Sequence, residues 1–232
     1  NMQKEVRINS LFGETIYHAE IENYEKINKD IVSHVQSFVK ASPGSTAATT
    51  DVKGNTMFTD LETAKDNLHT DNKYKDLFKQ LEVHITNFLK AKGYDESKFD
   101  AHITKAWATY TVKDQHIASH KHTASHFSMV YYARNDQMGD IQFEKELASQ
   151  TGLFIPPTKE YITDWNQFNF ASYIIPVKTG DFVIFPSGLL HYTQTNTKDD
   201  PRISISGDIL LTMKENIKTE HCIPHPSGWK TL

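Results

Sequence analysis

The sequence predicts a mainly β fold that is preceded by helices. Up to about residue 95, apolar residues recur at intervals of three and four, as they do on one face of an amphipathic helix. From about residue 101 onward, β-type residues occur in short runs separated by turn signals. Because short turns cannot hold crossover helices, we expect an antiparallel barrel or sandwich and no βαβ units.

Two helices are expected in the N-terminal part. In the first, Ile27, Ile31 and Val35 share one face. The second carries a longer stripe, and Gly93 follows it, where a helix commonly ends in a left-handed cap. This stripe consists of Tyr74, Leu77, Phe78, Leu81, Ile85, Phe88 and Leu89. Residues 41–71, between the helices, are rich in Ser, Thr, Gly, Asn and Asp and are expected to form a loop.

Six β-type runs follow, and they span residues 106–112, 126–133, 140–143, 173–177, 182–185 and 202–213. The sequence Lys-Thr-Gly-Asp at 178–181 predicts a tight turn between two of them. Residues 145–172 interrupt the series with aromatic residues and prolines. Such an insertion is either a lid or substrate loop, or a packed excursion without a role.

Length and composition fit a single domain. The 232 residues, of which 38% are hydrophobic, suffice for one core. We expect a helical part to about residue 95, a β core over about 101–213 and a C-terminal tail over 214–232. The formal net charge of −4 gives no basic surface for nucleic acid, and no apolar run is long enough to span a membrane. With Cys222 as the one cysteine and no secretory signal, a cytoplasmic location is expected.

Histidines are concentrated in one part of the chain, where four of the twelve fall close together: His116, His120, His122 and His126. In an extended strand His120 and His122 would point to the same face and could bind one ion. His191, which follows the run 182–185 and a short turn, is the candidate third ligand. Imidazole suits Fe, Zn, Cu and Ni, and three ligands leave positions open for substrate or O₂. A chance pair on a histidine-rich surface would look the same.

The run 202–213 has a polar face and an apolar face. Arg202, Ser204, Ser206 and Asp208 alternate with an apolar set that includes Ile203, Ile205 and Ile209. A planar guanidinium beside a hydroxyl can capture a carboxylate by a bidentate contact. The alternative for Arg202 is a surface salt bridge.

Six segments in one order carry a family resemblance: His120-Lys-His122, Ser128-Met-Val-Tyr-Tyr132, Gly139-Asp-Ile-Gln-Phe143, Pro176-Val-Lys-Thr-Gly180-Asp-Phe-Val-Ile-Phe-Pro186, His191 and Arg202-Ile-Ser204. In this order the chain resembles the 2-oxoglutarate/Fe(II)-dependent oxygenases. Within them it is most similar to a family of bacteria and phages that carries an H-x-H pair. The resemblance covers residues 107–211, about half of the chain.

The resemblance implies a double-stranded β-helix, the jelly-roll fold also found in cupins, with the N-terminal helices packed on its larger sheet. It also implies that His120 and His191 are the two histidines of the metal triad. Arg202 and Ser204 match the pair that holds the distal carboxylate of 2-oxoglutarate. Tyr132 matches a tyrosine that hydrogen-bonds the same carboxylate in prolyl-hydroxylase-like members.

The chain departs from the usual motif at His122, where most members have Asp or Glu. Three arrangements are open. His122 is the third ligand, or water or 2-oxoglutarate takes that place, or His122-Thr-Ala124 resembles the H-x-A motif of iron halogenases. His116 and His126 are expected on the pocket wall or the surface.

The implied reaction uses Fe(II), 2-oxoglutarate and O₂, couples the conversion of 2-oxoglutarate to succinate and CO₂ to another oxidation, and hydroxylates a C–H bond of an unidentified small molecule or peptide. No nucleic-acid or membrane partner is expected, and the oligomeric state is open. The protein could also be phage-encoded and act in a bacterial host. The rival hypotheses are a cupin-type metal-binding protein, dioxygenase or isomerase that does not use 2-oxoglutarate, and a non-catalytic protein that retains the ligands as relics.

Overall fold

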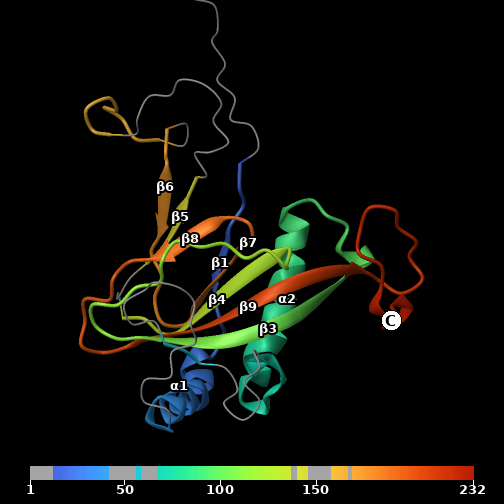
Figure 1. Ribbon diagram of the computed structural model, residues 1–232, viewed down its shortest axis with the longest axis horizontal. Coiled ribbons are helices and arrows are strands. Elements are labelled where there is room, and N and C mark those ends of the chain that lie inside the picture. The colour runs from blue at the N-terminus through green and yellow to red at the C-terminus, as the bar shows by residue number, and fades with distance from the viewer. Residues whose placement is uncertain (1–12, 42–55, 59–66, 137–139, 146–157, 167–168) are drawn as a thin grey trace, which may run out of the picture.

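The computed structural model describes residues 13–41, 56–58, 67–136, 140–145, 158–166 and 169–232 (Figure 1). This part of the chain contains nine strands in two antiparallel sheets, and more of its residues lie in strands than in helices. The mainly β fold and the antiparallel pairing expected from the sequence are therefore confirmed. None of the helices in the described ranges has the length and apolar character needed to cross a membrane.

The larger sheet has six strands in the order β1-β7-β4-β9-β3-β2. Their bounds are β1 Tyr17–Glu20, β2 Thr56–Phe58, β3 Phe99–Thr111, β4 Phe127–Arg134, β7 Asp181–Pro186 and β9 Arg202–Met213. The smaller sheet has the order β6-β5-β8, with β5 Ile141–Glu144, β6 Ser172–Ile175 and β8 Leu190–Thr193. The turn expected at 178–181 joins the sheets, and its Asp181 N–H donates to the Lys178 carbonyl at 3.1 Å.

Helices α1 (Tyr24–Ala41) and α2 (Lys75–Ala91) lie against one face of the larger sheet (Figure 1). The Phe88 ring of α2 meets the Phe127 ring of β4 with centroids 5.1 Å apart, and Asn28 of α1 accepts a hydrogen bond from the Tyr131 hydroxyl at 2.6 Å. Gly93, at φ 78°, ends α2. Its N–H and that of the next residue donate back into the last turn, as in a Schellman motif.

Strand β9 lies between β3 and β4 and divides the interior. Its apolar residues Ile203, Ile205 and Ile209 belong to the core shared with the helices. Its polar residues therefore face the opposite side, towards the smaller sheet, as the alternation in the sequence predicts.

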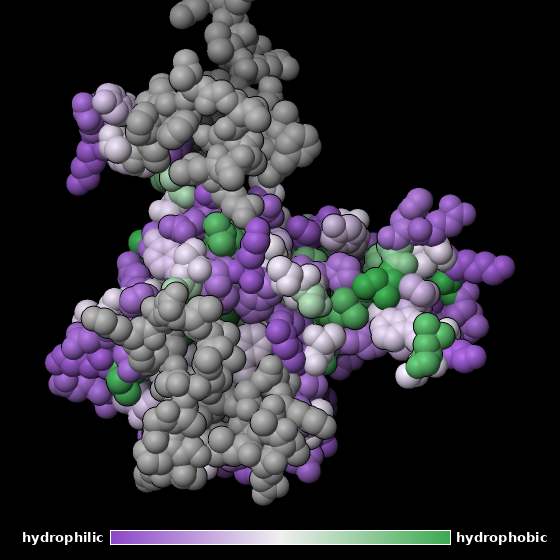
Figure 2. All heavy atoms as spheres, viewed as in Figure 1, coloured by the Kyte–Doolittle hydropathy of each residue, from purple (hydrophilic) through white to green (hydrophobic). Residues whose placement is uncertain are grey.

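On the face seen in Figure 2 hydrophilic side chains predominate, and apolar side chains gather near the C-terminal end at the right.

The structure differs from the sequence prediction in the shortest elements. Strand β1 is not expected from the sequence, and β2 lies within the segment 41–71 that was expected to be loop. Each has four residues or fewer and pairs along one side with a longer strand, so tertiary pairing decides its conformation. Four short 3-10 helices are also present in the described ranges: Leu68–Thr70, Asn72–Tyr74, Glu96–Lys98 and Pro226–Gly228. Half of the insertion 145–172, namely 146–157 and 167–168, lies outside the described residues, as does Gly139 of the resemblance.

Candidate metal centre and co-substrate pocket

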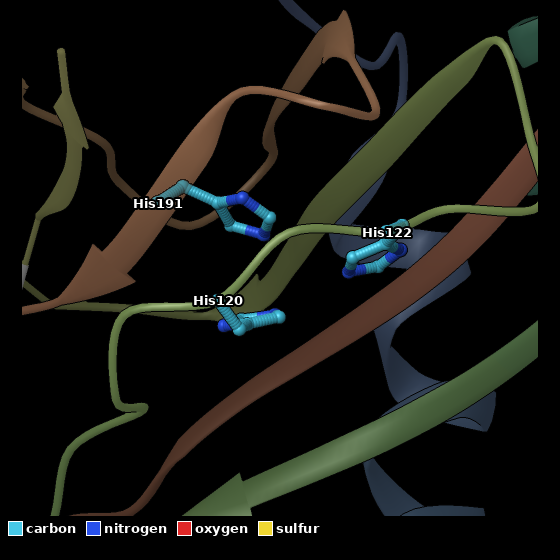
Figure 3. A group of neighbouring side chains, drawn as sticks. All are labelled: His120, His122 and His191. Atoms are coloured by element: carbon cyan, nitrogen blue, oxygen red, sulfur yellow. The ribbon is translucent and has the colours of Figure 1, made fainter. Parts of the chain in front are cut away.

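The backbone brings the three predicted metal ligands together. His120 and His191 form an isolated antiparallel bridge, in which each N–H donates to the other residue's carbonyl, at 3.0 and 2.9 Å. His122 is anchored separately, because its N–H donates to the Ser187 carbonyl at 2.8 Å. Each imidazole offers a nitrogen within 4.8 Å of the other two. Figure 3 shows the rings turned towards a shared space between β8 and the segment before β4.

The strand expected through His120 and His122 is not present as a regular strand. Residues 121–126 contain bends, and these backbone anchors replace a continuous ladder. The rings of His120 and His122 still lie side by side, with centroids 5.2 Å apart and planes 28° apart. His191 follows β7 and a short turn, as expected, and is the second residue of the next strand, β8.

Each of the three rings has its Nδ1 occupied. The Nδ1 of His120 lies 2.8 Å from the Ala118 carbonyl, and that of His191 lies 2.9 Å from the Leu189 carbonyl. The Nδ1 of His122 lies 2.5 Å from the Asp208 carboxylate. Since each partner is an acceptor, Nδ1 carries the proton in the neutral ring and Nε2 keeps its lone pair. This is the tautomer that a metal-ligating histidine needs.

Burial favours the neutral form of two of the metal-site histidines. Burial, and after it the nearby His120, lowers the pKa of His191 to about 3. The pKa of His120 is also lowered, chiefly by burial, although the Ala118 carbonyl opposes the shift. Because imidazole must be deprotonated to bind a metal, these two rings are ready to ligate at neutral pH.

Because His191 is buried, we expect acid to destabilise the metal-free protein. Above about pH 6.5, His191 is neutral in both the folded and the unfolded chain. Below that pH the unfolded chain takes up a proton that folded His191 binds only near pH 3, so the free energy of unfolding should fall, by about 2 kcal/mol at pH 5. Urea unfolding at pH 7 and pH 5 with a chelator measures the change. His191→Gln should lose less stability over the same range, and an equal loss would show that His191 does not titrate as expected.

Below the histidines lies a pocket of about 370 Å³ whose floor is the polar face of the larger sheet. The register aligns residues of β4, β9 and β3 in rows across this floor. The three complete rows are Ser128–Asp208–Lys105, Val130–Ser206–Trp107 and Tyr132–Ser204–Thr109. Cross-strand neighbours on one face are close enough to interact, so the side chains of each row can contact one another.

Arg202 lies at one end of the floor and is almost completely buried. Its guanidinium donates to the Thr193 hydroxyl at 2.7 Å and to the Gln194 carbonyl at 3.3 Å. Burial lowers the pKa of Arg202, but a guanidinium remains protonated at any ordinary pH. The pocket thus contains a fixed positive charge, and the alternative of a surface salt bridge for Arg202 is excluded by its burial.

The Tyr132 hydroxyl lacks a hydrogen-bond partner among the described residues, although it is fully buried. Burial raises the pKa of Tyr132, so this hydroxyl stays protonated and can donate. Tyr132 lies opposite Ser204, which is two residues from Arg202 on the same face of β9. A buried unsatisfied donor beside a cation is the environment that a bound carboxylate would complete.

Two residues at the site were not assigned a role from the sequence, namely Trp107, which lines the pocket, and Asp208, which contacts His122. Asp208 accepts hydrogen bonds from His122 and from the Ser128 hydroxyl, the latter at 2.8 Å, and pairs with Lys105 at 3.0 Å. Burial by itself would raise the pKa of Asp208, but these partners hold the pKa of the carboxyl below its ordinary value. Trp107 lies beside the His122 ring, with centroids 5.6 Å apart. Alternation places Asp208 on the polar face, but its contact with His122 depends on the tertiary fold. Neither His116 nor His126 lines the pocket.

Residues 105–208, which include the whole floor and all three histidines, match the sequence family described as "Putative 2OG-Fe(II) oxygenase". By sequence, the core of this chain is similar to the 2OG-Fe(II) oxygenases. The family resemblance expected from the six ordered segments is thereby confirmed. No curated protein matches the chain by sequence.

Solved structures share the fold of the oxygenase core. The epimerase SnoN, in complex with Fe³⁺, alpha ketoglutarate and nogalamycin RO, has a TM-score of 0.58 at 10% identity, over 91% of this chain and 91% of its own. A prolyl-4-hydroxylase from Pseudomonas putida has a TM-score of 0.54 at 11% identity, over 85% and 92%. A prolyl hydroxylase from Trichoplax adhaerens, in complex with a hypoxia inducible factor peptide fragment, has 0.53 at 10% identity, over 84% and 83%.

Proposed function

We propose that this oxygenase binds Fe(II) and 2-oxoglutarate, uses O₂, and hydroxylates a substrate while releasing succinate and CO₂. The observation that carries this proposal is the combination of three converging imidazoles with a buried cation and an unsatisfied tyrosine hydroxyl in one pocket. A cupin-type metal protein would need the imidazoles as metal ligands, but it would not need Arg202 and Tyr132 to bind a co-substrate carboxylate. The SnoN complex holds iron and alpha ketoglutarate in the same fold.

In this proposal His120, His122 and His191 hold the iron through Nε2. Their Nδ1 partners fix the tautomer and the ring orientation, so little reorganisation accompanies metal binding. Three protein ligands suit an octahedral ion because they leave positions for the co-substrate and O₂. When bound, the iron would supply the redox chemistry, and the protein supplies binding, orientation and electrostatics.

Arg202, Ser204 and Tyr132 would hold the distal carboxylate of 2-oxoglutarate. Arg202 supplies charge and a planar pair of donors, while Ser204 and Tyr132 each supply a hydroxyl. Their positions in neighbouring strands of one sheet fix their spacing more tightly than loops would. The nearby apolar side chains Val130 and Phe185 exclude water, which strengthens each of these polar contacts.

The role of His122 is testable by substitution. If His122 is a ligand, His122→Ala should weaken metal binding strongly, whereas His122→Asp should keep it because Asp restores the commoner triad. Calorimetric titration of Mn(II) into each variant measures the effect. Should His122→Ala bind Mn(II) as tightly as the wild-type protein, His122 is not a ligand, and the water-filled and halogenase-like arrangements become the better hypotheses.

A coupled assay tests the whole function. Anaerobic protein should bind Fe(II) and then 2-oxoglutarate, and adding O₂ should produce succinate. If the metal-loaded protein fails to bind 2-oxoglutarate at millimolar concentration, the cupin-type function replaces the oxygenase function.

The proposal extends to the organisation of the chain. The chain acts as one domain, with a double-stranded β-helix over about 101–213, the N-terminal helices as the outer cover of the larger sheet, and 214–232 as a tail. The substrate is a small molecule or a peptide side chain, and the protein works in the cytoplasm of a bacterium, either as a host protein or as a phage-encoded one. The prolyl hydroxylases of the same fold favour a peptide as the first class to screen.

A further inference from the structure

Asp208 is a buried carboxylate that is connected to the metal site through His122. The Oδ1 atom of Asp208 lies 2.5 Å from the Nδ1 of His122, and the Asp208 side chain is 2% exposed. The Ser128 hydroxyl donates to the same oxygen at 2.8 Å. The other two histidines have backbone carbonyls at the equivalent position, so His122 is the one of the three ligand candidates whose partner carries charge.

His122 also occupies the place where a carboxylate stands in the two-histidine triad of non-haem iron oxygenases. Three neutral imidazoles leave the full charge of a divalent ion uncompensated in a largely buried pocket. A carboxylate hydrogen-bonded to a ligating histidine raises the basicity of that ligand and brings negative charge close to the ion. His122, which stands in place of the usual ligand carboxylate, is thus the ligand candidate whose imidazole is hydrogen-bonded to a carboxylate, that of Asp208.

We infer that Asp208 is a positioning residue of the metal centre, which supplies through His122 the negative charge that a ligand carboxylate would otherwise supply directly. This inference rests on the proposed function, and it adds a fourth residue to the metal site. His122 and Asp208 together act as one extended anionic ligand. The sheet sets its geometry, because β9 fixes Asp208 between Ser128 of β4 and Lys105 of β3.

Lys105 does not cancel this charge. It contacts Oδ2, the oxygen on the other side of the carboxylate, at 3.0 Å, while Oδ1 faces His122. The Lys105 side chain is 43% exposed, so solvent screens its charge, whereas the His122 side chain is 11% exposed. Lys105 therefore orients Asp208, and the less screened interaction is the one between Asp208 and the metal site.

The first test removes the charge and keeps the shape. Asp208→Asn retains an oxygen that can accept from His122 Nδ1, so the ring orientation is preserved while the negative charge is lost. The affinity for Mn(II), measured by calorimetry without 2-oxoglutarate, should fall about 10- to 100-fold, as it does when charged partners of ligating histidines are removed. Asp181→Asn is the matched control, because Asp181 is also buried and paired with a histidine, but that histidine, His18 at 3.2 Å, is not one of the three metal-site histidines. It should leave the affinity unchanged.

The second test distinguishes charge supply from packing. In a His122→Asp background the ligand position carries its own carboxylate, and Asp208 no longer acts through a ligating imidazole. Adding Asp208→Asn to that background should therefore cost clearly less affinity for Mn(II) than it costs in the wild-type background. If Asp208 serves only to keep the fold, the same substitution will weaken binding equally in both backgrounds.

The outcomes separate the two proposals. A wild-type protein that binds no divalent metal would overturn both the metal centre and the role of Asp208. Wild-type binding with an affinity that changes less than about twofold in Asp208→Asn, or an equal loss in the two backgrounds, would overturn the role of Asp208 alone. A loss in the wild-type background together with a clearly smaller loss in the His122→Asp background would establish it.

Discussion

His191→Ala should abolish metal binding. His191 is 5% exposed, its backbone is paired with that of His120, and its Nδ1 is held by the Leu189 carbonyl. Truncation leaves the two remaining imidazoles without a third ligand on the facing strand. The affinity should fall by more than the roughly 100-fold that an outer partner of a ligand can contribute. Metal analysis after dialysis should give about one Fe(II), Mn(II), Co(II) or Ni(II) ion per wild-type chain and none in the variant.

Another histidine, His116, provides the control for this result. His116→Ala should retain the metal, because His116 does not line the pocket. Thermal unfolding of both variants in the metal-free state checks that the fold is intact. Unchanged metal content in folded His191→Ala would show that the site lies elsewhere. The content should also fall in acid, but only well below pH 6.5, because burial lowers the pKa of His191 and His120 and protons compete with the metal for imidazole only at lower pH.

Regular alternation made the pocket floor predictable. The polar and apolar faces of 202–213 could be separated by period alone, and the same holds for the shared face of Ser128 and Tyr132. The structure places both sets in one pocket and leaves the isoleucines of β9 in the core behind it. Strand alternation is a local property that the sequence records directly.

Contacts set by register and by irregular backbone could not be predicted in the same way. Asp208 meets His122 across 86 positions of sequence, and Lys105 reaches Asp208 only after a register shift between Ile103 and Lys105. A shift of this kind changes which residues share a face, and no periodicity reveals it. The bridge between His120 and His191 joins two short segments whose conformation depends on each other.

Arg202→Ala should remove most of the affinity for 2-oxoglutarate and leave metal binding intact. Arg202 is 1% exposed, and its guanidinium is oriented by Thr193 and Gln194. If it captures the distal carboxylate, truncation leaves that carboxylate without its charged partner in a dry pocket. The expected cost is about 2–5 kcal/mol, or roughly 30-fold to several thousand-fold in dissociation constant. Titration of 2-oxoglutarate into the Mn(II) form, or the anaerobic Fe(II) form, measures it.

Graded variants separate charge from geometry in this pocket. Arg202→Lys should recover only part of the lost affinity, because an ammonium supplies charge without the planar fork. Tyr132→Phe and Ser204→Ala each delete one neutral hydroxyl and should cost about 1 kcal/mol. Tyr132→Phe should also stabilise the protein without 2-oxoglutarate, or leave its stability unchanged, since the Tyr132 hydroxyl is unsatisfied in the described structure. If Arg202→Ala binds 2-oxoglutarate as well as the wild-type protein does, the carboxylate is held elsewhere and the cupin-type function becomes the better one.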